Sequence, residues 1–374
     1  MTQVNIYGPY FGQDGYSSHV RGLSNALNKL EGIEVALGTQ RPVDWVRHVN
    51  DDELQMLNRD LMKGDINLMI GIPTFWSLLM CEDKPFIGFC VWEGDRVPES
   101  WIEIFLDNRL NQIWVPSNHT KEAIWHTIQN YEKINDEKHT YKKILDKIKI
   151  VPHGVDVDLF KPLNIKHSKF TFVMNGGWVY GWKDRKGLSY GIKAFCEEFS
   201  KDENVRMIVK INSCYGGDLQ KNINELKIEN KTPAELQIVP QQIPFKDLVK
   251  VYNEGDIFVN TSLADGFNLN CLEAQACGLP VLTTSFGGQS DFCNNDNGWL
   301  LEEGTMKENK WDLQYEGTSW KEPSIEEIRK KMRDCYNNQI EVTTKGMTSR
   351  MDSKDWTWDC SARKALEAIE LTVL

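Results

Sequence analysis

Short apolar, β-branched runs alternate along this chain with stretches that repeat apolar residues at helical spacing. The first pair is Val4–Gly8, which predicts a strand, and Ser17–Leu30, which predicts a helix with one apolar face. Because strands that alternate with helices pair through crossover connections, this rhythm predicts a parallel sheet covered on both faces. The further strands predicted in this half are Glu34–Gly38, Asn67–Gly71, Phe86–Val91, Gln112–Pro116 and Lys149–Pro152.

The rhythm stops at Asp156–Ser168, a polar segment with no periodicity, which predicts a linker. It then restarts, so the sequence predicts two parallel α/β units with a break near residue 165. Glu302–Trp320 is polar with scattered aromatic residues and predicts an elaborated loop. The predicted strands of the second half are Phe170–Met174, Val205–Ile211, Leu236–Val239, Ile257–Asn260 and Pro280–Thr284. The predicted helices are Leu188–Phe199, Phe245–Asn253, Leu272–Ala276, Ile325–Asn337 and Ser361–Leu371.

Composition and charge narrow the class of function. The 374 residues include 54 acidic and 43 basic side chains, and the net charge of −11 argues against a protein that binds duplex nucleic acid. Ile66–Cys81 is apolar but too short and too broken to span a bilayer, and Met1–Tyr10 lacks the pattern of a signal peptide. The 9 cysteines form no C-x-x-C pair, which fits reduced thiols and a cytoplasmic location.

The loops that follow the strands are expected to carry the chemistry. Ligands of doubly wound sheets bind beyond the carboxyl ends of the strands, here in a cleft expected between the two domains. Gly12 and Gly15 lie in the first such loop, where they allow close approach of a ligand. The helix that follows favours an anion such as a phosphate at its N-terminus. A plain glycine-bearing turn stays the alternative, since the spacing is not G-x-G-x-x-G.

The most informative segment runs from Asp265 into a predicted helix that contains Glu273. The two carboxylates lie eight positions apart, and both can face one ligand that rests on the helix N-terminus. Carboxylates there accept hydrogen bonds from hydroxyl groups of a sugar or a ribose, while Gly266 and nearby backbone N–H groups can hold a phosphate. The alternative is a helix with acidic capping residues.

This segment resembles the acidic-x7-Glu signature of the retaining nucleotide-sugar glycosyltransferases of family 4, the glycosyl transferases group 1. Those proteins usually read E-G-F-G-x-x-x-x-E-A-M-A-C-G-x-P-V. This chain has Asp265 for the first Glu, Asn268 for a common Gly and Gln275 for a common Met. Because Asp keeps the charge but is one methylene shorter than Glu, the change bears on donor-sugar specificity more than on the fold.

Other motifs occur in the family's order over nearly the whole chain. The resemblance implies an α/β fold of the GT-B type, with two Rossmann-like doubly wound parallel-sheet domains facing a central cleft. We expect an acceptor-side domain over residues 1–164, a donor-binding domain over 165–350, and a helix at 351–374 that crosses back to the first domain. The motifs are Val91–Glu93 with Arg96–Pro98, Trp114–Ser117, Val151–Asp156 with Phe160–Pro162, Asp184–Leu188 and Trp320–Pro323.

The resemblance implies roles for residues of the second domain. Glu273 is expected to bind the ribose hydroxyls of the donor, Asp265 to accept hydrogen bonds from the donor sugar, and Lys186 to contact the diphosphate. The family usually adds an Arg several positions before this Lys; none stands there, so Arg185 or Lys183 would have to substitute. Backbone amides expected to face the sugar or phosphate belong to Gly266, Phe267, Asn268 and Leu269.

In the first domain, Gly15 resembles the glycine that closes onto the phosphate. Many members place a His near the sugar at the end of the fourth strand, where this chain has Glu93 after Trp92. We predict Glu93 to be an active-site carboxylate; a surface or salt-bridged Glu is the alternative. Candidates for sugar or acceptor contacts are His19, Trp92, Trp178 and Trp182.

The resemblance thus predicts a retaining glycosyltransferase that moves a sugar from a UDP- or GDP-linked donor to an acceptor hydroxyl. We expect no cofactor, because the nucleotide sugar is a substrate. We expect no metal either, because Asp156-Val157-Asp158 imitates a metal-binding D-x-D but lies in the linker motif. The predicted catalytic residues are Glu93, Lys186 and Asp265. Alternatives are a nucleotide-sugar epimerase or hydrolase of the same fold, and a non-enzymatic carbohydrate-binding protein. The negative charge counts against a nucleic acid acceptor.

Overall fold

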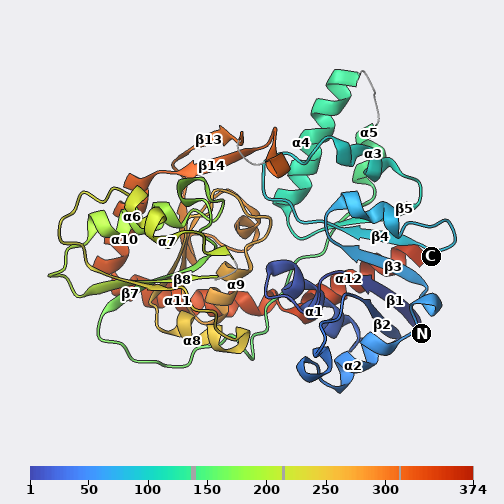
Figure 1. The fold of residues 1–374 in the computed structure, drawn as a ribbon, viewed down its shortest axis with the longest axis horizontal. Helices are drawn as coiled ribbons and strands as arrows, with labels where there is room; N and C mark the ends of the chain where they lie inside the picture. The colour runs from blue at the N-terminus through green and yellow to red at the C-terminus, as the bar shows by residue number, and fades with distance from the viewer. Residues whose placement is uncertain (136–139, 213–214, 311–312, 374) are drawn as a thin grey trace. The chain divides into compact units, whose positions relative to one another are not determined.

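The computed structural model describes residues 1–135, 140–212, 215–310 and 313–373, and the chain divides into two compact units (Figure 1). Unit 1 comprises Met1–Gly154, Asn309–Thr318 and Trp356–Leu374. Unit 2 comprises Val155–Glu308 and Ser319–Asp355. The chain therefore passes from one unit to the other after residues 154, 308, 318 and 355, whereas the sequence placed its breaks after residues 164 and 350.

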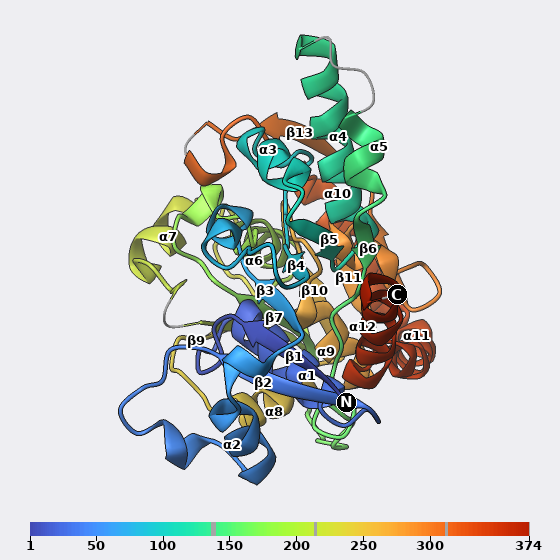
Figure 2. The ribbon, with the colours of Figure 1, turned by 90° about the vertical axis from the view of Figure 1, so that its right-hand side faces the viewer.

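Unit 1 is built on a six-stranded parallel sheet in the order β2-β1-β3-β4-β5-β6. The order reverses between β1 and β3, as in a doubly wound sheet. Helices α4 and α5 pack side by side (Figure 2). The strands are β1 (Thr2–Tyr7), β2 (Ile33–Gly38), β3 (Ile66–Ile70), β4 (Phe86–Phe89), β5 (Leu110–Val115) and β6 (Ile148–Ile150). The helices are α1 (Gly15–Leu27), α2 (Asp51–Asn58), α3 (Ser100–Leu106), α4 (Asn118–Asn135), α5 (Thr140–Leu145) and α12 (Trp358–Val373).

The C-terminal helix α12 completes the core of unit 1. Ala362, Ala365 and Ile369 on α12 are buried in one cluster with residues of α1 and of the sheet. Gly22 on α1 makes this contact possible, since a Cβ there would lie 2.1 Å from the indole of Trp358. Burying apolar surface of this kind is the main stabilising term of a fold, so α12 is an integral part of unit 1.

Unit 2 has a second six-stranded parallel sheet, in the order β12-β11-β10-β7-β8-β9. Figure 1 shows α6 and α10 on one side of this sheet and α8 and α11 on the other. The strands are β7 (Phe170–Gly176), β8 (Val205–Ile211), β9 (Glu235–Val239), β10 (Ile257–Asn260), β11 (Val281–Thr284) and β12 (Gly298–Leu301). The helices are α6 (Leu188–Glu198), α7 (Leu219–Glu225), α8 (Leu248–Asn253), α9 (Leu269–Ala276), α10 (Ile325–Asn337) and α11 (Gln339–Asp352).

The sequence prediction of two parallel α/β units is confirmed, and the predicted helix Ile325–Asn337 coincides with α10. The prediction of a loop over Glu302–Trp320 was wrong in part. That segment contains β13 (Gly304–Glu308), which pairs antiparallel with β14 (Ser319–Pro323). Every residue of β13 is exposed, so no alternation of apolar and polar residues marked this strand in the sequence.

No helix in the described part of the chain is long and apolar enough to cross a membrane.

Candidate functional site

The candidate donor site lies where the strand order of unit 2 reverses. From β7 the chain winds outward through β8 to β9, whereas from β10 it winds the other way through β11 to β12. The loops after β7 and β10 therefore meet at the carboxyl edge of the sheet, which is where ligands of doubly wound sheets bind. Lys186 lies in the first loop and Asp265 in the second.

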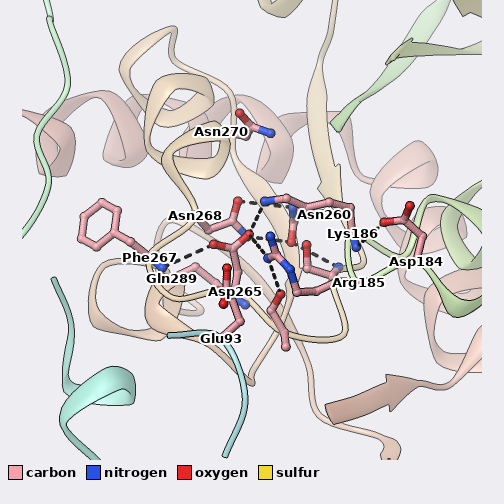
Figure 3. A network of polar contacts seen from close by, with 12 residues as sticks. Glu93, Asp184, Arg185, Lys186, Asn260, Asp265, Phe267, Asn268, Asn270 and Gln289 are labelled. Atoms are coloured by element: carbon pink, nitrogen blue, oxygen red, sulfur yellow. Dashed lines mark hydrogen bonds and ion pairs between the residues drawn. The ribbon is translucent and has the colours of Figure 1, made fainter. Parts of the chain in front are cut away.

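The two loops are joined by charged side chains (Figure 3). The Lys186 ammonium donates a hydrogen bond to Oδ2 of Asp265, and the Arg185 guanidinium lies 3.5 Å from the same oxygen. Arg185 also donates to the backbone carbonyl of Ala264, at 3.0 Å. The backbone N–H of Lys186 is in turn held by Asp184, at 3.0 Å. Two cations thus surround one carboxylate at the edge of the sheet.

These cations decide the charge of the carboxylate. Asp265 is buried, and burial alone would raise its pKa, but the nearby charges of Lys186 and Arg185 lower the pKa below its ordinary value. Asp265 is therefore ionised at neutral pH. The sequence left open whether Arg185 or Lys183 takes the place of the missing Arg; the structure places Arg185 at Asp265, while the Lys183 side chain is exposed.

Asn268 begins helix α9 in a left-handed conformation, with φ of 75°. This explains why a Gly is common at the position, since Gly adopts positive φ without strain and Asn is among the few other residues that tolerate it. The Asn268 side chain donates to Oδ1 of Asn260 at the end of β10, at 2.9 Å. The side chain thus anchors the loop to the strand, which a Gly could not do.

The loop from Asp265 to Asn268 is also supported from behind by Gly288. The N–H of Gly288 donates to the carbonyl of Asp265 at 2.8 Å, and a Cβ on Gly288 would lie 2.1 Å from the carbonyl of Gly266. Phe267 is buried, with its ring 5.2 Å from that of Phe292. Since the side chains of Phe267 and Asn268 are engaged in the support of this loop, a ligand at the start of α9 would meet backbone groups there, including those of Leu269, the first helical residue.

Glu273 lies one turn further along α9 and is buried. Its Oε2 accepts a hydrogen bond from the Tyr252 hydroxyl at 2.8 Å, and that hydroxyl accepts one from Asn175 at 3.2 Å. Burial raises the pKa of Glu273 to about 7, against an ordinary value of 4.5, while the Tyr252 hydrogen bond acts in the opposite direction. A buried carboxylate of this kind can accept hydrogen bonds from ligand hydroxyls.

In unit 1 the glycine loop follows β1, at the point where that sheet reverses its order. Gly15 is the first residue of α1, and a Cβ there would meet nothing within 4 Å. Asp14 caps the helix by accepting a hydrogen bond from the N–H of Ser17, at 3.0 Å. The Arg21 guanidinium on α1 donates to the carbonyl of Gly12, at 2.7 Å, and so holds the loop against the helix.

Glu93 lies in the loop that follows β4, also in unit 1. Its backbone carbonyl is 2.7 Å from Nε2 of His119, and its Oε2 accepts a hydrogen bond from the Tyr315 hydroxyl at 3.1 Å. Trp92 is buried; its indole N–H donates to the carbonyl of Arg96 at 2.5 Å. Trp92 is therefore a structural support of this loop.

Three other residues were predicted to contact the sugar or the acceptor, namely His19, Trp178 and Trp182. Two of them are buried and the third is partly buried. The imidazole of His19 is fully buried, 4.2 Å from the rings of Phe89 and His153, and burial lowers its pKa well below the ordinary value. Trp178 is fully buried and donates to Ser189 at 2.8 Å, so its faces cannot stack on a sugar. Trp182 is partly buried.

Comparison with known proteins agrees with this arrangement. Residues 170–310 match the family model of the glycosyl transferases group 1. A probable sucrose-phosphate synthase of Thermosipho melanesiensis is 27% identical over 246 residues, which cover 63% of this chain and 50% of that protein. The match spans all six strands of the sheet of unit 2, so the resemblance to the glycosyl transferases group 1 lies in that sheet. The matches to curated relatives span between 28% and 50% of the length of those relatives.

Solved structures show the same fold over the whole chain. A glycosyltransferase from Rickettsia africae superposes on 100% of this chain and 98% of its own, with a TM-score of 0.69 and 16% identity. The Anabaena protein HepE, solved with UDP and glucose, superposes on 99% of this chain and 100% of its own, with a TM-score of 0.61 and 12% identity. The fold of this chain is therefore GT-B.

Within this family signature the sequence located Asp265 and Glu273 but not the residues that hold them. Tyr252 and Asn260 were missed because nothing in their local sequence distinguishes them from core residues of a helix and a strand. Among the described residues, no group of three or more His, Cys, Asp or Glu side chains is arranged to hold a metal ion.

Proposed function

We propose that this protein is a retaining glycosyltransferase that moves a sugar from a nucleoside-diphosphate donor to an acceptor hydroxyl without a metal ion. The observation that carries the proposal is that Lys186, Arg185 and Asp265 meet where the sheet of unit 2 reverses, in the loops that lead to the helix with the buried Glu273. The match to the glycosyl transferases group 1 and the fold shared with the UDP-bound HepE support it.

The donor would be held by three kinds of group. Glu273 accepts hydrogen bonds from the ribose hydroxyls, Asp265 from hydroxyls of the sugar, and Lys186 donates to the diphosphate. In the described structure the Lys186 ammonium binds Asp265, and its three donors allow it to bind a phosphate oxygen as well. The salt bridge then serves to hold the ammonium in place before the donor arrives.

Transfer breaks the bond between the anomeric carbon and the phosphate oxygen and forms a bond to the acceptor oxygen. Negative charge develops on the leaving diphosphate, where Lys186, Arg185 and the start of α9 stabilise it. The acceptor attacks from the face that the phosphate leaves, so the configuration is retained, and the acceptor proton passes to the leaving phosphate oxygen. Glu93 is proposed as the carboxylate that favours positive charge at the anomeric carbon.

The cations of unit 2 also support the proposal that no metal is required. Many nucleotide-sugar sites neutralise a diphosphate with a divalent cation held by carboxylates. Here Asp265 is engaged by Lys186 and Arg185, and these two side chains can supply the positive charge themselves.

Nucleotide binding tests the proposal directly. Calorimetry with UDP and with GDP is expected to give binding for one of them, and Lys186→Met is expected to weaken it about 10- to 100-fold, the range for a hydrogen bond to a charged group. Lys169→Met is a matched control, because Lys169 directly precedes β7, at the opposite end of that strand from the loop with Lys186, and pairs with Glu235 on the surface. Equal affinity of the Lys186→Met variant and the wild type would overturn the assignment.

Turnover of the identified donor separates the remaining alternatives. A transferase is expected to consume donor slowly alone and faster with the correct acceptor. Rapid turnover without any acceptor would favour a hydrolase or an epimerase, and the absence of any nucleotide binding would favour a carbohydrate-binding protein.

A further inference from the structure

The loop that carries Glu93 is contacted by a segment far away in the sequence. Residues 309–318 belong to unit 1, although the strands on either side of them, β13 and β14, belong to unit 2. We call Tyr315–Thr318 the tip segment. It lies beyond residues 170–310, which match the family model, so the family match assigns it no role.

Tyr315 makes two contacts with the Glu93 loop. Its hydroxyl donates a hydrogen bond to Oε2 of Glu93 at 3.1 Å, and its ring centroid lies 5.0 Å from that of Trp92. Tyr315 is only 8% exposed. A phenol that is packed in this way has few rotamers, so its hydroxyl is a fixed donor for the carboxylate.

A second pair of residues holds the tip segment on the same loop. The Thr318 hydroxyl donates to Oδ1 of Asp95 at 3.2 Å. Gly94 leaves the space for it, since a Cβ on Gly94 would lie 1.8 Å from the Thr318 hydroxyl oxygen. The N–H of Thr318 also donates to the carbonyl of Tyr315 at 3.1 Å, which closes the tip segment into a turn. The loop and the tip segment are therefore shaped to fit each other.

Two other contacts of this loop hold its backbone. His119 lies 2.7 Å from the carbonyl of Glu93, and Thr120 donates to the carbonyl of Trp92 at 3.2 Å. Neither of them touches the Glu93 carboxylate, so the torsions of the side chain depend on contacts of the carboxylate itself. Tyr315 supplies such a contact from a rigid, buried ring.

We propose that Tyr315 is a positioning residue for Glu93 and that the tip segment is part of the catalytic machinery of this protein. The inference rests on the proposed function, in which Glu93 favours positive charge at the anomeric carbon. A misplaced carboxylate would lower the rate of transfer and leave donor binding by unit 2 unchanged. The reason is that an interaction made only in the transition state changes the rate of the chemical step and not the affinity for the donor.

Tyr315→Phe tests the proposal, because it removes the hydroxyl and keeps the ring against Trp92. We expect kcat to fall about 10-fold or more, as for loss of a hydrogen bond to a charged group, with the donor KM unchanged. In the Glu93→Gln background the same substitution is expected to have a much smaller effect. The control is Tyr336→Phe, which alters a tyrosine packed between the rings of Phe170 and Phe199 in unit 2.

Thermal unfolding of the same variants gives a readout that does not depend on activity. The cycle of Tyr315→Phe, Glu93→Gln and the double variant is expected to show coupling between the two side chains. A folded Tyr315→Phe protein with wild-type kcat overturns the proposal, and so does a cycle without coupling. If the wild type consumes no nucleotide sugar, the proposed function fails, while the unfolding cycle still reports whether Tyr315 holds Glu93.

Discussion

Glu273→Gln is expected to make the protein more stable above pH 7 while weakening its binding of nucleotide. The carboxyl group is buried beneath the start of α9, where its charged form has lost most of its hydration. Gln has nearly the same shape and keeps an oxygen to accept the hydrogen bond from Tyr252. The substitution therefore removes the cost of burying a charge without opening a cavity.

The magnitude follows from the pKa of Glu273. Its rise from 4.5 to about 7 on folding corresponds to about 3 kcal/mol. Since the folded-state pKa is the higher one, the folded state binds the proton more tightly than the unfolded state. The free energy of unfolding due to this group is thus highest below pH 4.5 and falls as the pH rises to about 7. Gln does not titrate, so the stability of the Glu273→Gln variant relative to the wild type should increase between pH 4.5 and about pH 7.

Urea unfolding at pH 5 and pH 8 measures the effect. We expect the Glu273→Gln variant to gain roughly 2–3 kcal/mol relative to the wild type between the two pH values, or roughly 4 °C in melting temperature at the upper limit. Glu229→Gln serves as the control, because Glu229 is exposed and should give no such change. A variant no more stable than the wild type at pH 8, or a difference that does not depend on pH, would refute the reasoning.

Three further outcomes are expected. Asn268→Ala should lower the free energy of unfolding by about 1–2 kcal/mol, because Ala tolerates a φ of 75° less well than Asn and loses the bond to Asn260. Asn268→Gly should cost less, because Gly loses the same bond but adopts this φ without strain, and equal melting temperatures for the two variants would contradict this. Arg333→Leu should lower the free energy of unfolding by about 1–3 kcal/mol at pH 7, because the hydrogen bond from Arg333 lowers the pKa of Glu203 and so stabilises the folded state. Urea unfolding should show this difference shrinking below about pH 4, where Glu203 becomes protonated, and a difference that stays constant with pH would contradict the reasoning. Thorough chelation should leave donor turnover unchanged, and a strict requirement for added Mn²⁺ or Mg²⁺ would overturn the proposal of a metal-free reaction.

The elements that sequence patterns located are those with a clear apolar period. Helix α10 has a Ser324 cap and a buried stripe of Ile328, Met332 and Cys335, and its predicted bounds were correct. Helix α11 was not predicted. Its buried residues are Val342, Gly346 and Ser349, and Gly346 packs so closely that a Cβ would lie 2.4 Å from the carbonyl of Gly278. A stripe of small residues has no hydrophobic signal, although it buries the helix just as well.

The same limit applies to the candidate site. The sequence located Asp265 and Glu273 because their spacing within one loop and one helix forms a local pattern. It did not locate Tyr252, which lies 21 positions from Glu273, or Tyr315, which lies 222 positions from Glu93. Contacts of this kind depend on the packing of whole units. For the same reason the sequence could not distinguish tryptophans that face a ligand from tryptophans of the core, and Trp178, a predicted ligand contact, is buried.

The net charge of −11 does not prevent this protein from binding a diphosphate, because the relevant charges are local. Lys186 and Arg185 both lie at Asp265, so two cations face this one carboxylate at the edge of the sheet in unit 2. Glu273 carries less than a full negative charge at neutral pH, because its pKa of about 7 leaves it partly protonated. In the proposed site a ribose would offer hydroxyl donors that favour the charged form of Glu273, so part of the energy lost in burying the carboxylate would be recovered on nucleotide binding. Donor affinity should therefore rise with pH through this range, in the opposite direction to the stability of the free protein.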